Sequence, residues 1–330
     1  MFVSGFFCIV FISLALNNGV LALSVTKKET WQPTVSSLEE RQQLRGLSHH
    51  SETIRSKGFH HVEFYCGDAK STANQFCSSL GMTVVGSSSQ STGNDKCVSY
   101  GLASGDFQLL LTAPYSRAIN ANGVAGGGGG EVQYDAPEPL PGFDLEFAHD
   151  FFQRHGLAAR AIGLLVDDAK IAFDESVRNG AVPVLDPTFV KTCNGQVQNG
   201  VESSGCNMSE VKLYGDVVLR FVSFPDQKRQ SHPHATKSAS LVPFLPHLAP
   251  MPGKIIGKES FGIHTIDHAV GNVYNLLETY TYIKNFTGFH EFAEFTSEDV
   301  GTVDSGLNSV VLASDSENVL LPLNEPTDGQ

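Results

Sequence analysis

FGIHTIDHAVGNVYNLLETYTYIKNFTGFHEFAEFTSEDVGTVDSGLNSVVLASDSENVLLPLNEP, residues 261–326, is the stretch from which the fold can be predicted. It opens with a short apolar strand pattern over 263–270 that carries His268. A helix pattern follows, because Asn272 can cap it, apolar residues recur at helical spacing, and Gly288 can end it. Strand patterns complete the stretch over 289–295, 309–313 and 318–323. The order strand–helix–strand–strand–strand predicts a small module whose sheet can curl around a ligand.

The same order of elements occurs earlier in the chain. In GFHHVEFYCGDA, which begins at Gly58, apolar residues alternate as in a strand. Asp68 is placed to cap the helix pattern that follows, and Gly81 is placed to end it. Strand patterns come next over 83–85, 96–101 and 107–112.

A second copy begins near Ala158. An apolar strand leads into a helix that Asp167 or Asp168 can cap, and residues 210–224 have the pattern of a hairpin that turns at a Gly-Asp pair. Residues 58–224 are therefore predicted to form a complete domain of two βαβββ units, and the stretch quoted above begins a third unit. The predicted fold class is α+β, built from tandem βαβββ modules.

Composition and charge limit the kinds of partner. The 330-residue chain has a formal net charge of −13, and no basic stretch could neutralise the phosphates of a nucleic acid. We therefore expect no nucleic-acid partner. An anionic substrate would need a local positive centre, which a bound metal ion can supply.

The N-terminal stretch differs from the rest of the chain. Residues 2–16 are apolar and uncharged, about the length of a signal-peptide core and short of the roughly 20 residues that span a bilayer. We expect residues 1–22 to be a cleaved leader and residues 23–57 a polar extension. These would direct the chain to the secretory route or, as a two-part signal, to a plastid. A short anchor, an artefact of gene modelling and a cytoplasmic location are the alternatives.

Three further features are more simply explained without a functional site. Besides Cys8 there are five cysteines without metal-site spacing; Cys193 and Cys206 flank a polar loop and could pair in an oxidising compartment, with free thiols as the alternative. Gly126–Gly130 lacks the Lys and Ser/Thr of a phosphate-binding loop, which favours a surface insertion. Residues 225–260 are predicted to be an interdomain linker with exposed histidines.

Motifs along most of the chain resemble one family. IDHAVGN, FTGFHEFAEFTSEDVGT, SGLNS and VLLPLNEP are similar to the start of the catalytic half of the 4-hydroxyphenylpyruvate dioxygenases, and FHHVEFYCGDA, LTAPYS, HGLAARAIGLLVDDA and EVKLYGDVVLR to their N-terminal domain. The resemblance implies a glyoxalase-like (vicinal oxygen chelate) fold. In it, residues 58–224 would be a non-catalytic domain and residues 261–330 the first module of a truncated catalytic domain.

The resemblance also implies a site. His268 corresponds to the first of three Fe(II) ligands; the second His and the Glu would lie beyond Gln330, so the chain alone is expected to show no turnover. Residues matching the substrate pocket are Ser309, Asn324, Val270 and Pro322. The implied reaction is oxidative decarboxylation and ring hydroxylation of 4-hydroxyphenylpyruvate, a 2-oxo acid, with dioxygen to homogentisate, by a homodimer. A 4-hydroxymandelate synthase and a catalytically inactive scaffold or dimerisation module are the alternatives.

Other polar residues near the predicted ligand are expected to be structural. Asp267 should face away from His268 because side chains alternate along a strand, whereas His264 should share its face. In the first module His60 and His61 occupy the matching place, and a weak metal site formed by His61 with Glu63 is a minor alternative to a scaffold without a site. An incomplete third unit would leave a sheet face and an edge strand unpaired, exposing apolar residues such as Val310, Leu312, Val319 and Leu321. We expect it either to pack against the first domain or to self-associate.

Overall fold

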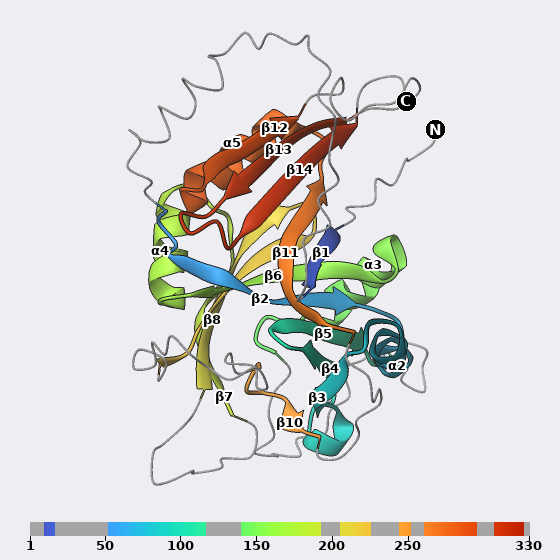
Figure 1. Cartoon of the computed structure of the whole chain (residues 1–330). Helices are drawn as coiled ribbons and strands as arrows, with labels where there is room; N and C mark the ends of the chain where they lie inside the picture. The colour runs from blue at the N-terminus through green and yellow to red at the C-terminus, as the bar shows by residue number, and fades with distance from the viewer. Residues whose placement is uncertain are drawn as a thin grey trace, which may run out of the picture.

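The fold contains three βαβββ modules. The computed structural model describes residues 10–16, 52–116, 140–192, 205–225, 244–251, 261–295 and 307–326, with the backbone alone for 10–16 and 293–295. Figure 1 shows the third module, in orange and red, at one end of the molecule beside the sheet of the first two. No helix in these ranges is long and apolar enough to cross a bilayer.

The first module has the predicted order. Asp68 caps its helix by accepting hydrogen bonds from the backbone N–H groups of Lys70 and Ser71, and Gly81 ends the helix in the left-handed conformation that glycine adopts most readily. Its elements are β2 (Ser56–Tyr65), α2 (Ala69–Leu80), β3 (Thr83–Ser88), β4 (Cys97–Ser104) and β5 (Phe107–Pro114).

The second module repeats this order after an additional helix, α3 (Leu145–His155). Asp168, one of the two predicted caps, accepts hydrogen bonds from Lys170 and Ile171 at the start of α4. Its elements are β6 (Ala158–Val166), α4 (Ala169–Arg178), β7 (Pro183–Lys191), β8 (Gly205–Tyr214) and β9 (Val217–Ser223). The sequence analysis did not predict α3, although Asp144 caps it by accepting a hydrogen bond from Phe147 N.

The first two modules and the short strand β10 (Ala249–Pro250) form one sheet of nine strands in the order β10-β3-β4-β5-β2-β6-β9-β8-β7. Within each module the first strand runs parallel to the last, since β2 pairs with β5 and β6 with β9. The two first strands, β2 and β6, pair antiparallel and join the modules. One face of this sheet packs on α2 and α4; we call the opposite face the inner face.

The third module has its own sheet. It contains β11 (Ile263–Asn272), α5 (Leu276–Thr287), β12 (His290–Phe295), β13 (Leu307–Ala313) and β14 (Leu320–Pro326), and β11 pairs parallel with β14 as in the other modules. The cap of α5 is Asn275, three residues after the predicted Asn272, whereas Gly288 ends the helix as predicted. On the other side of β11, β1 (Val10–Leu16) pairs antiparallel, so part of the predicted leader forms a strand.

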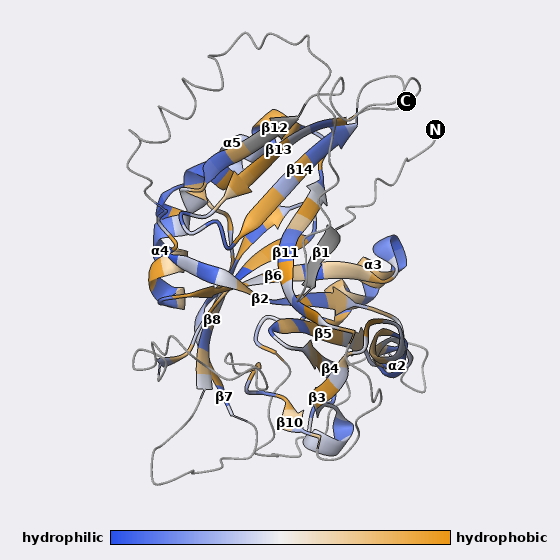
Figure 2. Cartoon of the chain, viewed as in Figure 1, coloured by the Kyte–Doolittle hydropathy of each residue, from blue (hydrophilic) through white to orange (hydrophobic). Residues whose placement is uncertain are grey.

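The third module packs against the second through one apolar core. Leu312 on β13, Leu321 on β14 and Phe286 on α5 are buried in the same cluster as Phe173 of α4 and Phe221 of β9. Figure 2 shows apolar residues along much of β13 and β14. The four residues that an unpacked module would expose are buried: Val310, Leu312, Val319 and Leu321. Of the two predicted outcomes, packing against the first domain is therefore the one observed.

Part of the predicted linker also belongs to the folded structure. Leu245 and Leu248 pack against Leu110 and Val222 on the inner face, and β10 (Ala249–Pro250) pairs with β3. His247 in this segment is only 3% exposed, so the expectation of an exposed linker histidine is wrong for this residue. The histidines at 232 and 234, the glycine run at 126–130 and Cys193 lie outside the described ranges, whereas Cys206 is buried as a free thiol.

Candidate functional site

The predicted site residues of the third module lie on one face of its sheet. Strand pairing places Ser309 of β13 opposite Asn324 of β14, and Asn324 opposite Asn272 of β11. Because side chains alternate along strands, Pro322 and Val270 share this face with them, two residues from Asn324 and Asn272 respectively. Ala269, Leu321 and Leu323, on the opposite face, are buried in the apolar core. We call the face that carries the predicted residues the open face.

His268 lies on the open face two residues before Val270. Its side chain is 31% exposed, and its Nδ1 is 2.7 Å from Oδ2 of Asp267. The prediction that Asp267 faces away is therefore wrong. The pairing of β1 with β11 shifts register between His268 and Ile266 and skips Asp267, so the alternation on which the prediction rested is interrupted at this residue.

This contact prepares the imidazole to bind a cation. When Nδ1 carries the proton and donates it to the carboxylate, the lone pair of Nε2 is left available, as in metal sites where a carboxylate orients a ligating histidine. His268 thus fits one ligand position of a metal site. Within the described ranges no group of three or more His, Cys, Asp or Glu side chains is arranged to hold a metal, so this part of the chain offers one ligand rather than a set.

The other predicted residues of the open face differ in burial. Ser309 and Val270 are buried, at 7% and 9% exposed, whereas Pro322 and Asn324 are half-buried. The Asn324 side-chain nitrogen donates to the side-chain Oδ1 of Asn272 at 3.4 Å, which orients the Asn324 amide along the sheet. The open face therefore combines an imidazole with an amide, a hydroxyl and two apolar groups.

His264 does not belong to this group. A second register shift in the β1–β11 pairing skips His264, so it is not in regular alternation with His268. It instead contacts the β4–β5 turn of the first module: its carbonyl accepts a hydrogen bond from Asp106 N at 2.8 Å, and Gly105 leaves room for its ring. His264 is structural, as predicted.

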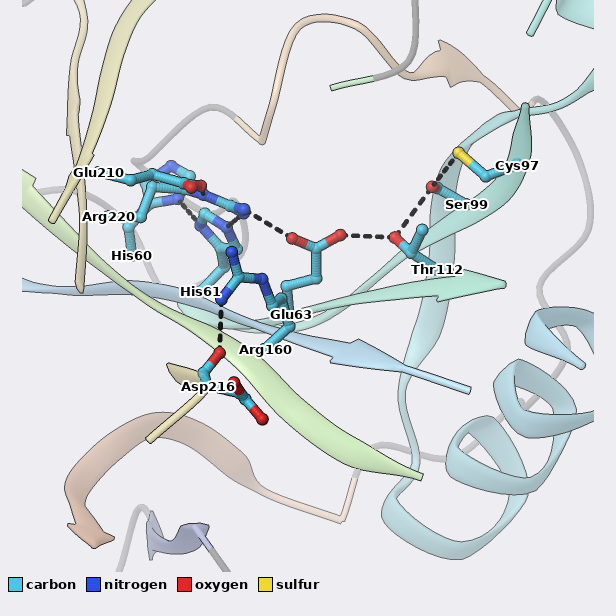
Figure 3. A network of polar contacts seen from close by, with 10 residues as sticks. All are labelled: His60, His61, Glu63, Cys97, Ser99, Thr112, Arg160, Glu210, Asp216 and Arg220. Carbon is cyan, nitrogen blue, oxygen red and sulfur yellow. Dashed lines mark hydrogen bonds and ion pairs between the residues drawn. The ribbon is translucent and has the colours of Figure 1, made fainter. Parts of the chain in front are cut away.

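The matching place in the first module has a different environment (Figure 3). His61 is fully buried on the inner face, and its Nε2 is 2.9 Å from a terminal nitrogen of Arg220 on β9. The same guanidinium donates to Glu63 Oε2 and to Glu210 Oε1, each at 2.6 Å. Arg220 is thus surrounded by two carboxylates and an imidazole at the junction of the two modules, which the minor prediction of a His61–Glu63 metal site did not foresee.

Electrostatics fix the protonation of this cluster. Burial lowers the pKa of His61 well below its ordinary value, and the nearby His60, Arg220 and His247 lower it further. Burial alone would lower the pKa of Arg220, but the carboxylates of Glu210 and Glu63 outweigh it and raise that pKa. The cluster therefore contains a neutral imidazole that accepts a hydrogen bond from a permanently charged guanidinium.

Neighbouring groups hold the cluster in place. Nδ1 of His61 is 2.6 Å from Nδ1 of His60, so a single proton shared between them satisfies both nitrogens. Glu63 accepts a further hydrogen bond from the Thr112 hydroxyl at 2.6 Å, and Thr112 contacts Ser99 at 3.0 Å. Gly163, paired with His61 across β2 and β6, has no side chain because a Cβ there would lie 2.6 Å from His61 Nδ1.

The chain was compared with known proteins. No family model matches it. It is 43% identical over 279 residues to the 4-hydroxyphenylpyruvate dioxygenase of Arabidopsis thaliana, an alignment that covers 84% of this chain and 56% of that protein. The 4-hydroxyphenylpyruvate dioxygenase of Daucus carota is 42% identical over 280 residues, covering 84% of this chain and 55% of that protein. The chain therefore spans about half the length of the curated relatives it matches.

A solved structure supports the fold. A triple mutant of 4-hydroxymandelate synthase from Streptomyces coelicolor superposes with a TM-score of 0.55 at 16% identity, over 83% of this chain and 64% of that one. At this identity the likeness concerns the architecture alone. The sequence matches to the plant proteins are stronger evidence, because along 84% of its length the chain is similar to 4-hydroxyphenylpyruvate dioxygenases at 42–43% identity.

Proposed function

We propose that this chain forms the N-terminal domain and the first catalytic module of a 4-hydroxyphenylpyruvate dioxygenase that converts its substrate to homogentisate. The observation that carries the proposal is His268, an imidazole on the open face whose Nδ1 is held by Asp267. The plant relatives, at 42% and 43% identity, support the same reaction. We expect a homodimer, which sedimentation analysis tests independently of activity.

In this proposal the residues of the open face have separate roles. Nε2 of His268 provides one Fe(II) ligand, and Asp267 fixes the tautomer that leaves this nitrogen free. Fe(II), when bound, supplies chelation of the 2-oxo acid and activation of dioxygen. Ser309 and Asn324 donate hydrogen bonds to the substrate, and Val270 and Pro322 contact its ring and exclude water.

A chimera tests the proposal. The part of this chain that aligns with the Arabidopsis thaliana relative replaces its counterpart there, and Fe(II) affinity, oxygen uptake and the product are measured. We expect homogentisate, loss of turnover to the metal-free blank in His268→Ala, and an Fe(II) affinity lowered about 10- to 100-fold in Asp267→Asn. Glu278→Gln, on the exposed surface of α5, is the matched control for a lost carboxylate.

The alternatives give different results in the same experiment. A 4-hydroxymandelate synthase would yield a mandelate in place of homogentisate. An inactive scaffold would give a folded chimera in which turnover is absent and in which His268→Ala changes nothing. Ser309→Ala and Asn324→Ala should raise the KM for 4-hydroxyphenylpyruvate and leave Fe(II) affinity unchanged; a fall in metal affinity instead would contradict their assignment to the substrate.

A further inference from the structure

The inner face of the first two modules holds a cation that belongs to the protein itself. Three acceptors from two strands, β2 and β8, converge on the Arg220 guanidinium: His61 Nε2 at 2.9 Å, Glu63 Oε2 at 2.6 Å and Glu210 Oε1 at 2.6 Å. All four residues are at most 3% exposed. A planar guanidinium, with five N–H donors, satisfies several acceptors at once in such a buried place.

The acceptors are of the types that bind divalent transition metals. Two carboxylate oxygens and one neutral imidazole nitrogen form a donor set suited to Zn²⁺ or Fe²⁺. Their formal charge of −2 is only half balanced by the single positive charge of Arg220. The side chains are spread around the guanidinium, which agrees with the finding that no metal-holding group of three exists within the described ranges.

A fourth candidate donor lies nearby without a partner. His247, on the segment that covers the inner face, is 3% exposed, and neither of its ring nitrogens has a hydrogen-bond partner. It is close enough to Arg220 for the guanidinium charge to act on it. Burying an imidazole without a hydrogen bond costs free energy of folding. The region around Arg220 therefore contains more polar groups than its hydrogen bonds satisfy.

We propose that Arg220 is the resident cation of a degenerate metal site on the inner face, formed by His61, Glu63 and Glu210. Its guanidinium occupies the space in which these residues would bind a divalent metal, and thereby keeps this half of the protein free of metal. Because glutamate side chains have several rotatable bonds, both carboxylates can close around a smaller ion once the guanidinium is removed. This inference concerns the first two modules and is independent of the dioxygenase proposal.

The full chain with Arg220→Ala tests the inference. Zn²⁺ and Co²⁺ are titrated at neutral pH, with thermal unfolding and the visible absorption of Co²⁺ as readouts. We expect metal to raise the Tm of Arg220→Ala by roughly 5 °C or more and to leave that of the native chain unchanged. Arg178→Ala is the matched control, since its guanidinium is exposed and pairs only with Glu175 in the same helix. The native chain and this control retain every surface histidine, so they account for adventitious binding.

A second substitution in the cluster should weaken metal binding. Arg220→Ala combined with Glu210→Gln should bind metal at least about tenfold more weakly than Arg220→Ala, because one charged ligand is lost. If Arg220→Ala does not fold alone, it is refolded with and without Zn²⁺; recovery only with the metal supports the site. Three results would overturn the inference. The first is refolding of Arg220→Ala with added guanidinium ion but not with Zn²⁺, and the second is no refolding under any of these conditions. The third is a metal response of Arg220→Ala equal to that of the native chain.

Discussion

His61 and His268 occupy the same place in two modules, yet their surroundings differ. Each lies on the first strand, seven residues before the helix cap, Asp68 in one case and Asn275 in the other. His61 is fully buried and accepts a hydrogen bond from a guanidinium, whereas His268 is 31% exposed and contacts a carboxylate. The cation beside His61 comes from the last strand of the neighbouring module. The module thus fixes where the imidazole lies, and the neighbour decides what it can bind.

Of the substitutions considered, removing the Arg220 guanidinium should lower the stability of the fold most. Arg220→Met leaves Glu63 and Glu210 buried without a cation, and we expect the free energy of unfolding to fall by about 3–5 kcal/mol. Urea denaturation of the full chain measures it. The matched control, Arg178→Met, should change stability by less than about 0.5 kcal/mol because that side chain is exposed. Equal effects of the two variants would show that the cluster around Arg220 is not structural.

Truncating each histidine compares the two places directly. His61→Ala removes a fully buried ring and an acceptor for Arg220, so we expect a loss of about 2–4 kcal/mol in the free energy of unfolding. His268→Ala, on the open face, should change it by less than about 0.5 kcal/mol. Parallel denaturation of the two variants tests the contrast. A large loss in His268→Ala would mean that this residue supports the fold rather than a ligand site.

The buried histidine that covers the inner face should make stability depend on pH. Burial, with the Arg220 charge, lowers the pKa of His247 to about 3 in the folded state, against about 6.5 when unfolded. The unfolded state therefore binds an additional proton between these values. The contribution of His247 is intact above pH 6.5 and is lost as the pH falls towards 3.

The size of this effect can be measured by denaturation at two pH values. Between pH 7.5 and 5.5, His247 should cost about 1.4 kcal/mol of unfolding free energy. His247→Leu fills the same space without a titrating group, so its pH dependence should be smaller by that amount. An unchanged pH dependence in His247→Leu would place the titrating group elsewhere.

The smallest expected losses of stability come from the helix caps, and they should be equal in the second and third modules. Asp168 and Asn275 cap α4 and α5 with side-chain oxygens that accept backbone N–H groups at 2.9 Å and 3.0 Å. Replacing either by Ala should cost roughly 1 kcal/mol, since in each case a side-chain oxygen accepts N–H groups of the first turn, those of Lys170 and Ile171 in α4 and that of Glu278 in α5. Thermal unfolding of the two variants checks this. A difference of more than about twofold would mean that the helices of the two modules depend on their surroundings, as the histidines do.

The modular order could be predicted from local signals, whereas the inner-face cluster could not. The Gly-Asp turn between β8 and β9 predicts the hairpin, but a regular register would place Glu210 opposite Phe221. A bulge between Lys212 and Tyr214 shifts the pairing by one residue and brings Glu210 opposite Arg220. Arg220, the charged residue of β9, and Glu210 on β8 were the available signal, and the bulge hid their pairing.

The same physical cause explains the error on the open face. The family resemblance, rather than alternation, named Ser309, Asn324, Val270 and Pro322, and those on β13 and β14 share a face because these two strands pair without interruption. Alternation was used to predict the direction of Asp267, and it failed there because a register shift removes this residue from the regular pattern. The helix α3 and the docked segment around His247 were missed for another reason. Neither follows a repeated pattern, and both are held by contacts distant in sequence.

The apolar core shared by the second and third modules has a consequence for biosynthesis. The ribosome completes α4 and β9 before it makes α5 and β13, and domains fold largely in that order during translation. The second module can therefore present Phe173 and Phe221 as a finished surface when Phe286 and Leu312 leave the exit tunnel. A substitution that destabilises the second module would then also prevent the third module from folding, because the apolar surface on which it packs would be missing. In the cell we expect the unfolded third module to be degraded.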